Sequence, residues 1–263
     1  MLPTLQIGPL ALPMPALITL AGIWIGLSVA ERQAWRYGLN PNNLYNLIFI
    51  GLVAGVVAAR LTYALRFPDV FASDPAGLLS RDLGLFDPLG GAVGGSLAAM
   101  IYAQRKGLSF WQTLDGITPG LAVFAIALGF SHLASGRAFG TPTQAPWGIE
   151  LWGAHRHPTQ VYEILAASLI FGALTPIHRR LQHNGASPTP GLFFLIFIAL
   201  SAFARLMIEP FRGDSPLLPG DLRLPQVAAW CILGLSLWGI GYMIKKQQRR
   251  NETMQHSRDS GIQ

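Results

Sequence analysis

Residues 191–208 read GLFFLIFIALSAFARLMI, and Arg205 is the only charged residue among them. Such a run is close to the roughly 20 apolar residues that a helix needs to cross the hydrocarbon core of a bilayer. Further apolar runs occur at 12–30, 44–65, 88–103, 112–133, 161–177 and 226–244. The sequence therefore predicts an all-α, polytopic membrane protein with about seven transmembrane helices.

The composition supports a membrane protein. Apolar residues make up 51% of the 263 residues and charged residues only 12%, against roughly 25% charged residues in soluble domains. So few charges cannot cover a surface that faces water. Residues 1–10 contain no basic side chain, so we expect the first run to be a retained span rather than a cleaved signal peptide.

Two features narrow the choice of partners. Five of the nineteen Lys and Arg residues lie at 245–263, directly after the last apolar run, and no aromatic residues alternate with them. That pattern favours anionic lipid headgroups and argues against nucleic acid. Cys231 is the only cysteine, which excludes an intrachain disulfide, and its apolar neighbours predict an inert, buried thiol.

The loop charges predict the orientation, because cytoplasmic loops carry an excess of Lys and Arg. One alternating set of segments contains eleven of these residues (31–42, 104–110, 178–190 and 245–263), and the other contains six (1–11, 65–87, 134–159 and 209–225). We therefore expect the N-terminus outside and the C-terminus in the cytoplasm. Residues 1–244 would form a membrane domain with outer loops 65–87, 134–159 and 209–225, followed by a basic cytoplasmic tail at 245–263.

Charged residues at membrane depth are the first candidates for a site, because an unpaired charge in lipid is costly. Arg205 and Glu209 are four residues apart and can pair on one helical face, which Arg212 continues if the helix survives Pro210. One interpretation is a snorkelling arginine with a structural partner. The other is a phosphate clamp, because a guanidinium matches phosphate oxygens. Arg60, toward the outer end of its helix, fits either interpretation.

Glycines dominate the third apolar run. Gly90, Gly91, Gly94 and Gly95 form a doubled pattern of small residues four apart. This pattern allows close helix packing, or alternatively a close approach of the backbone to a ligand.

Hydrogen-bonding residues crowd the start of the fifth run, where residues 156–163 read RHPTQVYE. Thr159 is expected to cap the helix that begins there. The spacing of His132, His155 and His157 matches no helical metal motif, so no metal site is predicted.

Taken together and in order, these segments resemble the bacterial prolipoprotein diacylglyceryl transferase family. The likeness covers most of the chain, includes the seven-span layout, and runs through ARLTYAL (59–65), GGAVGG (90–95), GTPT (140–143), PWG (146–148), RHPTQVYE (156–163) and RLMIEPFR (205–212). The resemblance implies transfer of a diacylglyceryl group from phosphatidylglycerol to the lipobox cysteine of a secreted prolipoprotein, without a cofactor. It also implies a bacterial inner-membrane location. The partners would be the phospholipid and the prolipoprotein signal peptides.

The chain departs from this family at several polar positions. The family's His-Gly-Gly reads Leu89-Gly90-Gly91, so its histidine is absent. The family signature Arg-x-Gly-Asn-Phe-x-Asn-Gly-Glu-x-x-Gly reads GFSHLASGRAFG at 129–140. The arginine has become Gly129, the first asparagine His132, and the glutamate Arg137.

Two hypotheses follow from these departures. In the first, the site has been rearranged: His132 is the base for the thiol, because histidine titrates near neutral pH, and Arg137 supplies the cationic charge lost at Gly129. Arg205, Arg60 and Arg137 then capture the headgroup, with Glu209 orienting Arg205. In the second, the chain is a non-catalytic lipid-binding or assembly protein with the same fold. A transporter is disfavoured, because no broken helices occur in matching halves.

The first hypothesis gives a full set of site residues. The predicted catalytic residues are His132, Arg137, Arg205 and Glu209, and the predicted substrate-binding residues are Arg60, Gly90, Gly91, Gly140, Arg156, His157, Gln160, Tyr162, Glu163 and Arg212.

Overall fold

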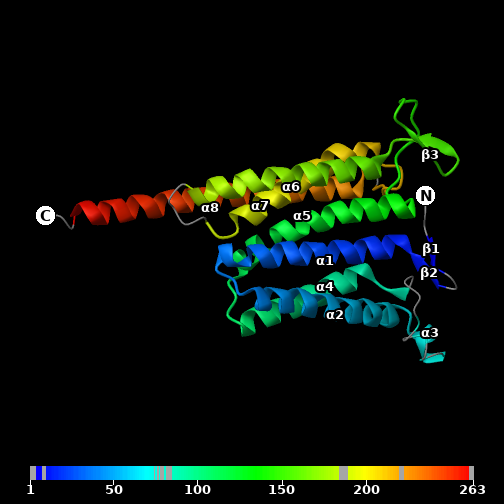
Figure 1. Cartoon of the computed structure of the whole chain (residues 1–263), viewed down its shortest axis with the longest axis horizontal. Helices are drawn as coiled ribbons and strands as arrows, with labels where there is room; N and C mark the ends of the chain where they lie inside the picture. The colour runs from blue at the N-terminus through cyan, green and yellow to red at the C-terminus, as the bar shows by residue number, and fades with distance from the viewer. Residues whose placement is uncertain are drawn as a thin grey trace. The chain divides into compact units, whose positions relative to one another are not determined.

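The computed structural model describes residues 4–7, 10–73, 75, 77, 80, 85–183, 189–218 and 222–260. Every predicted apolar run forms a long helix (Figure 1). These helices are α1 (Met14–Ala34), α2 (Pro41–Arg66), α4 (Pro88–Arg105), α5 (Phe110–Ser135), α6 (Thr159–His183), α7 (Leu192–Ile208) and α8 (Leu224–Ser260). The predicted helical membrane fold is confirmed.

Within the described residues, six of these helices are long and apolar enough to cross a membrane, so the chain is a multi-pass membrane protein. The exception is α4, an 18-residue helix whose first two turns hold four glycines. Glycine contributes little hydropathy, which lowers the apolar character of this helix. A seventh span at α4 stays a prediction, and so does the direction in which the chain crosses the membrane.

Short strands depart from the all-helical expectation. β1 (Thr4–Ile7) pairs antiparallel with β2 (Leu10–Pro13), and β3 (Ile149–Leu151) pairs antiparallel with β4 (Ala154–Arg156). A short helix, α3 (Pro68–Ser73), lies in the predicted loop 65–87. Segments of three to six residues carry too few side chains to show a periodic pattern.

Two expectations about the last helix are also corrected. α8 runs to Ser260, so the described part of the predicted tail at 245–263 continues the helix. Cys231 is exposed on α8, on a helix with the composition of a membrane span, whereas its apolar neighbours predicted burial. Apolar neighbours indicate burial in protein only when the surroundings are water, and here they also suit a face turned toward lipid.

The chain divides into two compact units, and the first comprises residues 31–116. Here α2 and α4 pack antiparallel through glycines. A Cβ on Gly95 would lie 2.6 Å from the carbonyl oxygen of Gly51, and one on Gly90 would lie 1.9 Å from Thr62 Oγ1. The glycine pattern of α4 therefore serves helix packing, the first of its two interpretations.

The second unit comprises residues 1–30 and 117–263. α1 and α5 cross where a Cβ on Gly120 would lie 2.5 Å from the carbonyl oxygen of Gly26, and α7 packs against both α6 and α8. The β1–β2 and β3–β4 hairpins lie at one end of this unit's helices, and the C-terminal end of α8 lies at the other (Figure 1). The N-terminal segment and the loop 134–159, predicted to share one side of the membrane, therefore lie at the same end of this unit.

The α2–α4 contact predicts a stability difference between two Gly→Ala substitutions. Gly95→Ala places a methyl group against the backbone of Gly51 and should lower the free energy of unfolding by about 1–3 kcal/mol. Gly172→Ala, on an α6 face with nothing within 4 Å, should have no such cost and should raise it by a few tenths of a kcal/mol. Thermal unfolding of the two variants in detergent measures both effects. Equal midpoints would contradict the packing.

Candidate active site

Polar side chains from α5, α6 and the end of α7 meet at Glu163, in the second turn of α6. His132 Nδ1 lies 2.8 Å from Glu163 Oε2. The other carboxylate oxygen, Oε1, accepts hydrogen bonds from Arg212 Nη1 at 2.6 Å and from Arg205 Nη1 at 3.2 Å. Glu163, predicted as one of several substrate contacts, is thus the centre of an ion-pair cluster.

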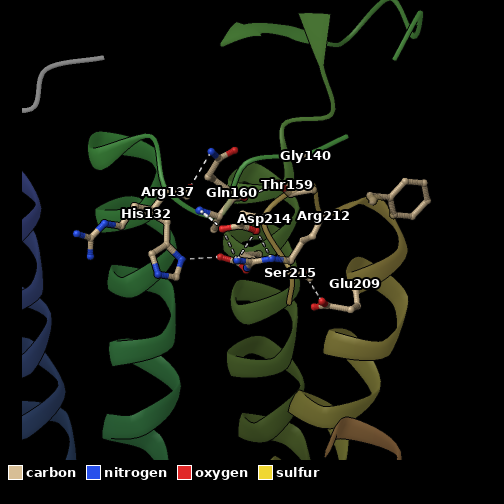
Figure 2. Close-up of polar contacts among 12 residues, drawn as sticks. His132, Arg137, Gly140, Thr159, Gln160, Glu209, Arg212, Asp214 and Ser215 are labelled. Carbon is tan, nitrogen blue, oxygen red and sulfur yellow. Dashed lines mark hydrogen bonds and ion pairs between the residues drawn. The ribbon is translucent and has the colours of Figure 1, made fainter. Parts of the chain in front are cut away.

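Glu209 is the second carboxylate of the cluster. Its Oε2 lies 2.8 Å from Arg205 Nε, which confirms the predicted pair, and its Oε1 accepts a hydrogen bond from Ser215. The Glu209 side chain is fully buried, and its ion pair with Arg205 offsets the cost of removing the carboxylate from water. Figure 2 shows Ser215 and Glu209 joined beside the loop that follows α7.

The helix does not survive Pro210. α7 ends at Ile208 and passes into a 3-10 turn, Glu209–Phe211, before Arg212. Arg212 nevertheless reaches Glu163, because the turn redirects the chain rather than extending it away from α6.

Asp214 is a member of the cluster that sequence reasoning missed. Its carboxylate accepts two hydrogen bonds from Arg212, Nε to Oδ1 and Nη2 to Oδ2, each at 3.0 Å. Asp214 Oδ2 also accepts from the backbone N–H of Ala138 at 3.0 Å. Figure 2 shows Asp214 between Arg212 and the chain near Arg137. Asp214 therefore ties the loop after α7 to the loop after α5.

Arg223 was also missed. Its Nη1 donates to the carbonyl oxygen of Glu209 at 2.8 Å and also to that of Arg212. The sequence gives no signal for this role, because nothing in the pattern indicates that a loop arginine will turn back onto the chain. Arg223 fixes the course of the loop that carries Arg212.

Exposure to solvent distinguishes the three basic side chains that contact Glu163. The side chain of Arg212 is 10% exposed, whereas those of Arg205 and His132 are 34% and 27% exposed. The guanidinium of Arg212 is therefore engaged with Glu163 and Asp214, whereas the side chains of Arg205 and His132 are the ones a substrate can reach. Within the described residues, three carboxylates (Glu163, Glu209 and Asp214) lie near three arginines (Arg205, Arg212 and Arg223). An anion would be held by directed hydrogen bonds rather than by a large excess of positive charge.

The start of α6 fixes the loop after α5. Thr159 Oγ1 donates to the carbonyl oxygen of Ala138 at 2.5 Å, and Gln160 Nε2 donates to that of Arg137 at 3.0 Å. Both side chains are fully buried. The Thr159 hydroxyl thus binds the preceding loop, where a helix cap had been expected.

The guanidinium of Arg137 points away from the cluster (Figure 2). The residue is exposed, and its carbonyl, rather than its side chain, makes the contact with Gln160. The structure therefore does not bring Arg137 together with Arg205. Its catalytic role stays a prediction.

Several other predicted substrate contacts are engaged within the protein. Arg156 donates from Nε to the carbonyl of Leu151 at 3.0 Å and from Nη1 to that of Gly140 at 3.2 Å. A Cβ on Gly140 would lie 2.2 Å from the carbonyl oxygen of His157, which explains glycine at this position. Arg156, Gly140 and His157 thus stabilise the β3–β4 hairpin and the chain next to it.

His157 and Tyr162 belong to an aromatic group beside the hairpin. The Tyr162 hydroxyl accepts from Trp147 Nε1 at 2.8 Å and lies 3.2 Å from His157 Nδ1. The His157 ring also meets Phe211 edge to face, with 5.1 Å between ring centroids. This group adjoins the segment that leads from α7 to Arg212.

Arg60, Gly90 and Gly91 lie in the other unit. Arg60 is buried, and its guanidinium donates to the carbonyl oxygens of Leu85, Ser80 and Gly77. It also lies over the Phe86 ring, 5.0 Å from the centroid. Arg60 thus organises the chain between α3 and α4, and its part in headgroup capture stays a prediction.

Comparison with known proteins agrees with the resemblance. The family model for prolipoprotein diacylglyceryl transferase matches residues 3–243. A phosphatidylglycerol–prolipoprotein diacylglyceryl transferase from Nostoc sp. is 28% identical over 97% of this chain and 94% of its own. The enzyme of that name from Clostridioides difficile is 30% identical over 78% of this chain and 80% of its own. The chain belongs to the prolipoprotein diacylglyceryl transferase family.

Proposed function

We propose that this protein transfers the diacylglyceryl group of phosphatidylglycerol to the lipobox cysteine thiol of a secreted prolipoprotein, in the bacterial inner membrane. Family membership supports this proposal. The observation that carries it is the Glu163 cluster, in which ionisable side chains from α5, α6 and the end of α7 meet at one end of membrane-spanning helices. Such residues in a membrane protein mark functional sites by default.

The reaction makes two demands on the site. The thiolate sulfur must attack the glyceryl carbon that carries the phosphate ester oxygen, forming a C–S bond as the C–O bond breaks. Glycerol phosphate then leaves with that oxygen and with one more negative charge than the ester had. The site therefore needs a base for the thiol proton and hydrogen-bond donors for the departing phosphate.

Arg205 fits the second demand. Glu209 holds its Nε and Glu163 holds Nη1, which fixes the plane of the guanidinium. Nη2 has no partner among the described residues and can donate to a phosphate oxygen, as a planar guanidinium does well. Arg137, which is exposed, stays a candidate for an additional headgroup contact.

His132 fits the first demand. Its Nδ1 faces Glu163, and its Nε2 has no partner among the described residues. In this proposal Nε2 takes the thiol proton and returns it to an oxygen of the leaving phosphate, so the ring is regenerated after each turnover.

Replacing Arg205 tests the headgroup assignment. Arg205→Ala should lower the rate of transfer of labelled diacylglycerol from phosphatidylglycerol to a lipobox peptide by on the order of 10²–10³-fold, because a donor to the developing phosphate charge is lost. Arg249→Ala, an exposed arginine of α8, is the control and should retain the wild-type rate. Equal rates for both variants would contradict the assignment. Wild-type protein that binds phosphatidylglycerol but transfers nothing would support the lipid-binding alternative instead.

Chemical rescue tests the base. His132→Ala should lower the transfer rate by roughly 10²–10⁴-fold, the usual contribution of a general base. Added imidazole should restore part of that rate, because it can occupy the space of the missing ring and accept the proton. Imidazole should not rescue Arg205→Ala. The base assignment would be wrong if His132→Ala kept its rate, or if imidazole acted equally on both variants.

A further inference from the structure

We infer that Glu163 is a positioning residue: it holds the His132 ring with the proton on Nδ1 and thereby makes Nε2 the atom that accepts the thiol proton. The inference rests on the proposed function and deepens it, because it assigns the arrangement that prepares the base.

The first step is the direction of the hydrogen bond. Two arginines donate to Oε1 of Glu163, which favours an ionised carboxylate, and the side chain is only 15% exposed. An ionised carboxylate only accepts hydrogen bonds. His132 Nδ1, 2.8 Å from Oε2, must therefore be the donor, and a neutral His132 ring carries its lone pair on Nε2.

The second step is the division of the carboxylate between its two oxygens. Both arginines bind Oε1, and His132 alone binds Oε2. Arg212 is kept in place by its two hydrogen bonds to Asp214, which in turn is held by the Ala138 N–H. Because Asp214 holds Arg212 against Oε1 of Glu163, Oε2 of Glu163 stays available to His132.

His155 and Glu150 form a second histidine–glutamate pair, which has a structural role and differs from the His132–Glu163 pair in exposure and in contacts. His155 Nδ1 lies 3.1 Å from Glu150 Oε1, but the Glu150 side chain is 76% exposed. His155 Nε2 is also occupied, 3.0 Å from the carbonyl oxygen of Ala145. Both ring nitrogens of His155 serve the hairpin, so the Glu150–His155 pair is a matched control for the Glu163–His132 pair.

The tautomer can be measured without any activity. In wild-type protein labelled with ¹⁵N-histidine, NMR at about pH 9, where histidine side chains are neutral, should show the His132 proton on Nδ1. The His132→Gln spectrum identifies the signal. A proton on Nε2 of His132 would overturn the inference. Because this measurement needs no transfer, its failure is distinct from failure of the proposed function, and it stands even if a Glu163 variant does not fold.

A double-mutant cycle tests whether Glu163 acts through His132. Glu163→Gln should lower kcat by roughly 10²-fold, because the amide removes the charge that orients and stabilises the base. The double variant Glu163→Gln/His132→Ala should lose far less than the product of the two single losses, since the two residues act as one unit and only the contacts of Glu163 with the arginines are lost independently of the histidine. Losses that multiply would overturn the inference, because Glu163 would then act independently of the histidine. Glu150→Gln should keep the wild-type rate, and thermal unfolding of each variant confirms that it is folded.

Discussion

The cost of leaving an ionised group unpaired at the end of a membrane helix dominates this structure. Glu163 is nearly buried, and it is stable there only because His132, Arg205 and Arg212 surround it. Each of those side chains comes from a different part of the chain, so the pairing requirement joins α5, α6, α7 and the loop after α7. Asp214 pairs with Arg212 and also accepts a hydrogen bond from the Ala138 N–H, which connects the loop after α5 to the cluster. The loops at this end are held by charge and backbone hydrogen bonds, where the apolar packing of the helices no longer reaches.

Most of the helical fold follows from the sequence, because membrane helices depend on the length and apolarity of one continuous segment. Residues 191–208 illustrate this: the predicted run and α7 (Leu192–Ile208) differ by one residue at a single end. α4 shows the limit of the rule. Its glycines reduce hydropathy and at the same time allow the close approach to Gly51, so the property that weakens it as a span is the one that builds its contact with α2. The hairpins β1–β2 and β3–β4 depend on pairing across a turn, and strands of three or four residues are too short for their sequence to predict that pairing.

The site was predictable where its geometry is local. Arg205 and Glu209 pair across one helical turn, and their spacing alone predicts that contact. Glu163 was recognised as polar but not as central, because its partners lie 31, 42 and 49 residues away along the chain. Asp214 and Arg223 carry no spacing signal at all, since each acts through a loop whose course is fixed only in the folded chain. The backbone contacts of Arg60 were also not predictable: its guanidinium donates to carbonyl oxygens of Leu85 and Ser80, and no pattern of side chains indicates such contacts.

Two of the chain's departures from the resembled family signature depend on the same helix contact. A Cβ on Gly129 would lie 2.7 Å from Ile164 Cγ1 and 3.2 Å from the Ile164 backbone nitrogen, so α5 and α6 touch there without a side chain between them. His132 lies three residues farther along α5 and faces Glu163, the neighbour of Ile164, at 2.8 Å. A side chain at 129 would crowd Ile164 and oppose this close approach of α5 to α6. A glycine at 129 and a histidine at 132 are therefore compatible with each other: the glycine permits the close helix approach beside which the imidazole meets the carboxylate.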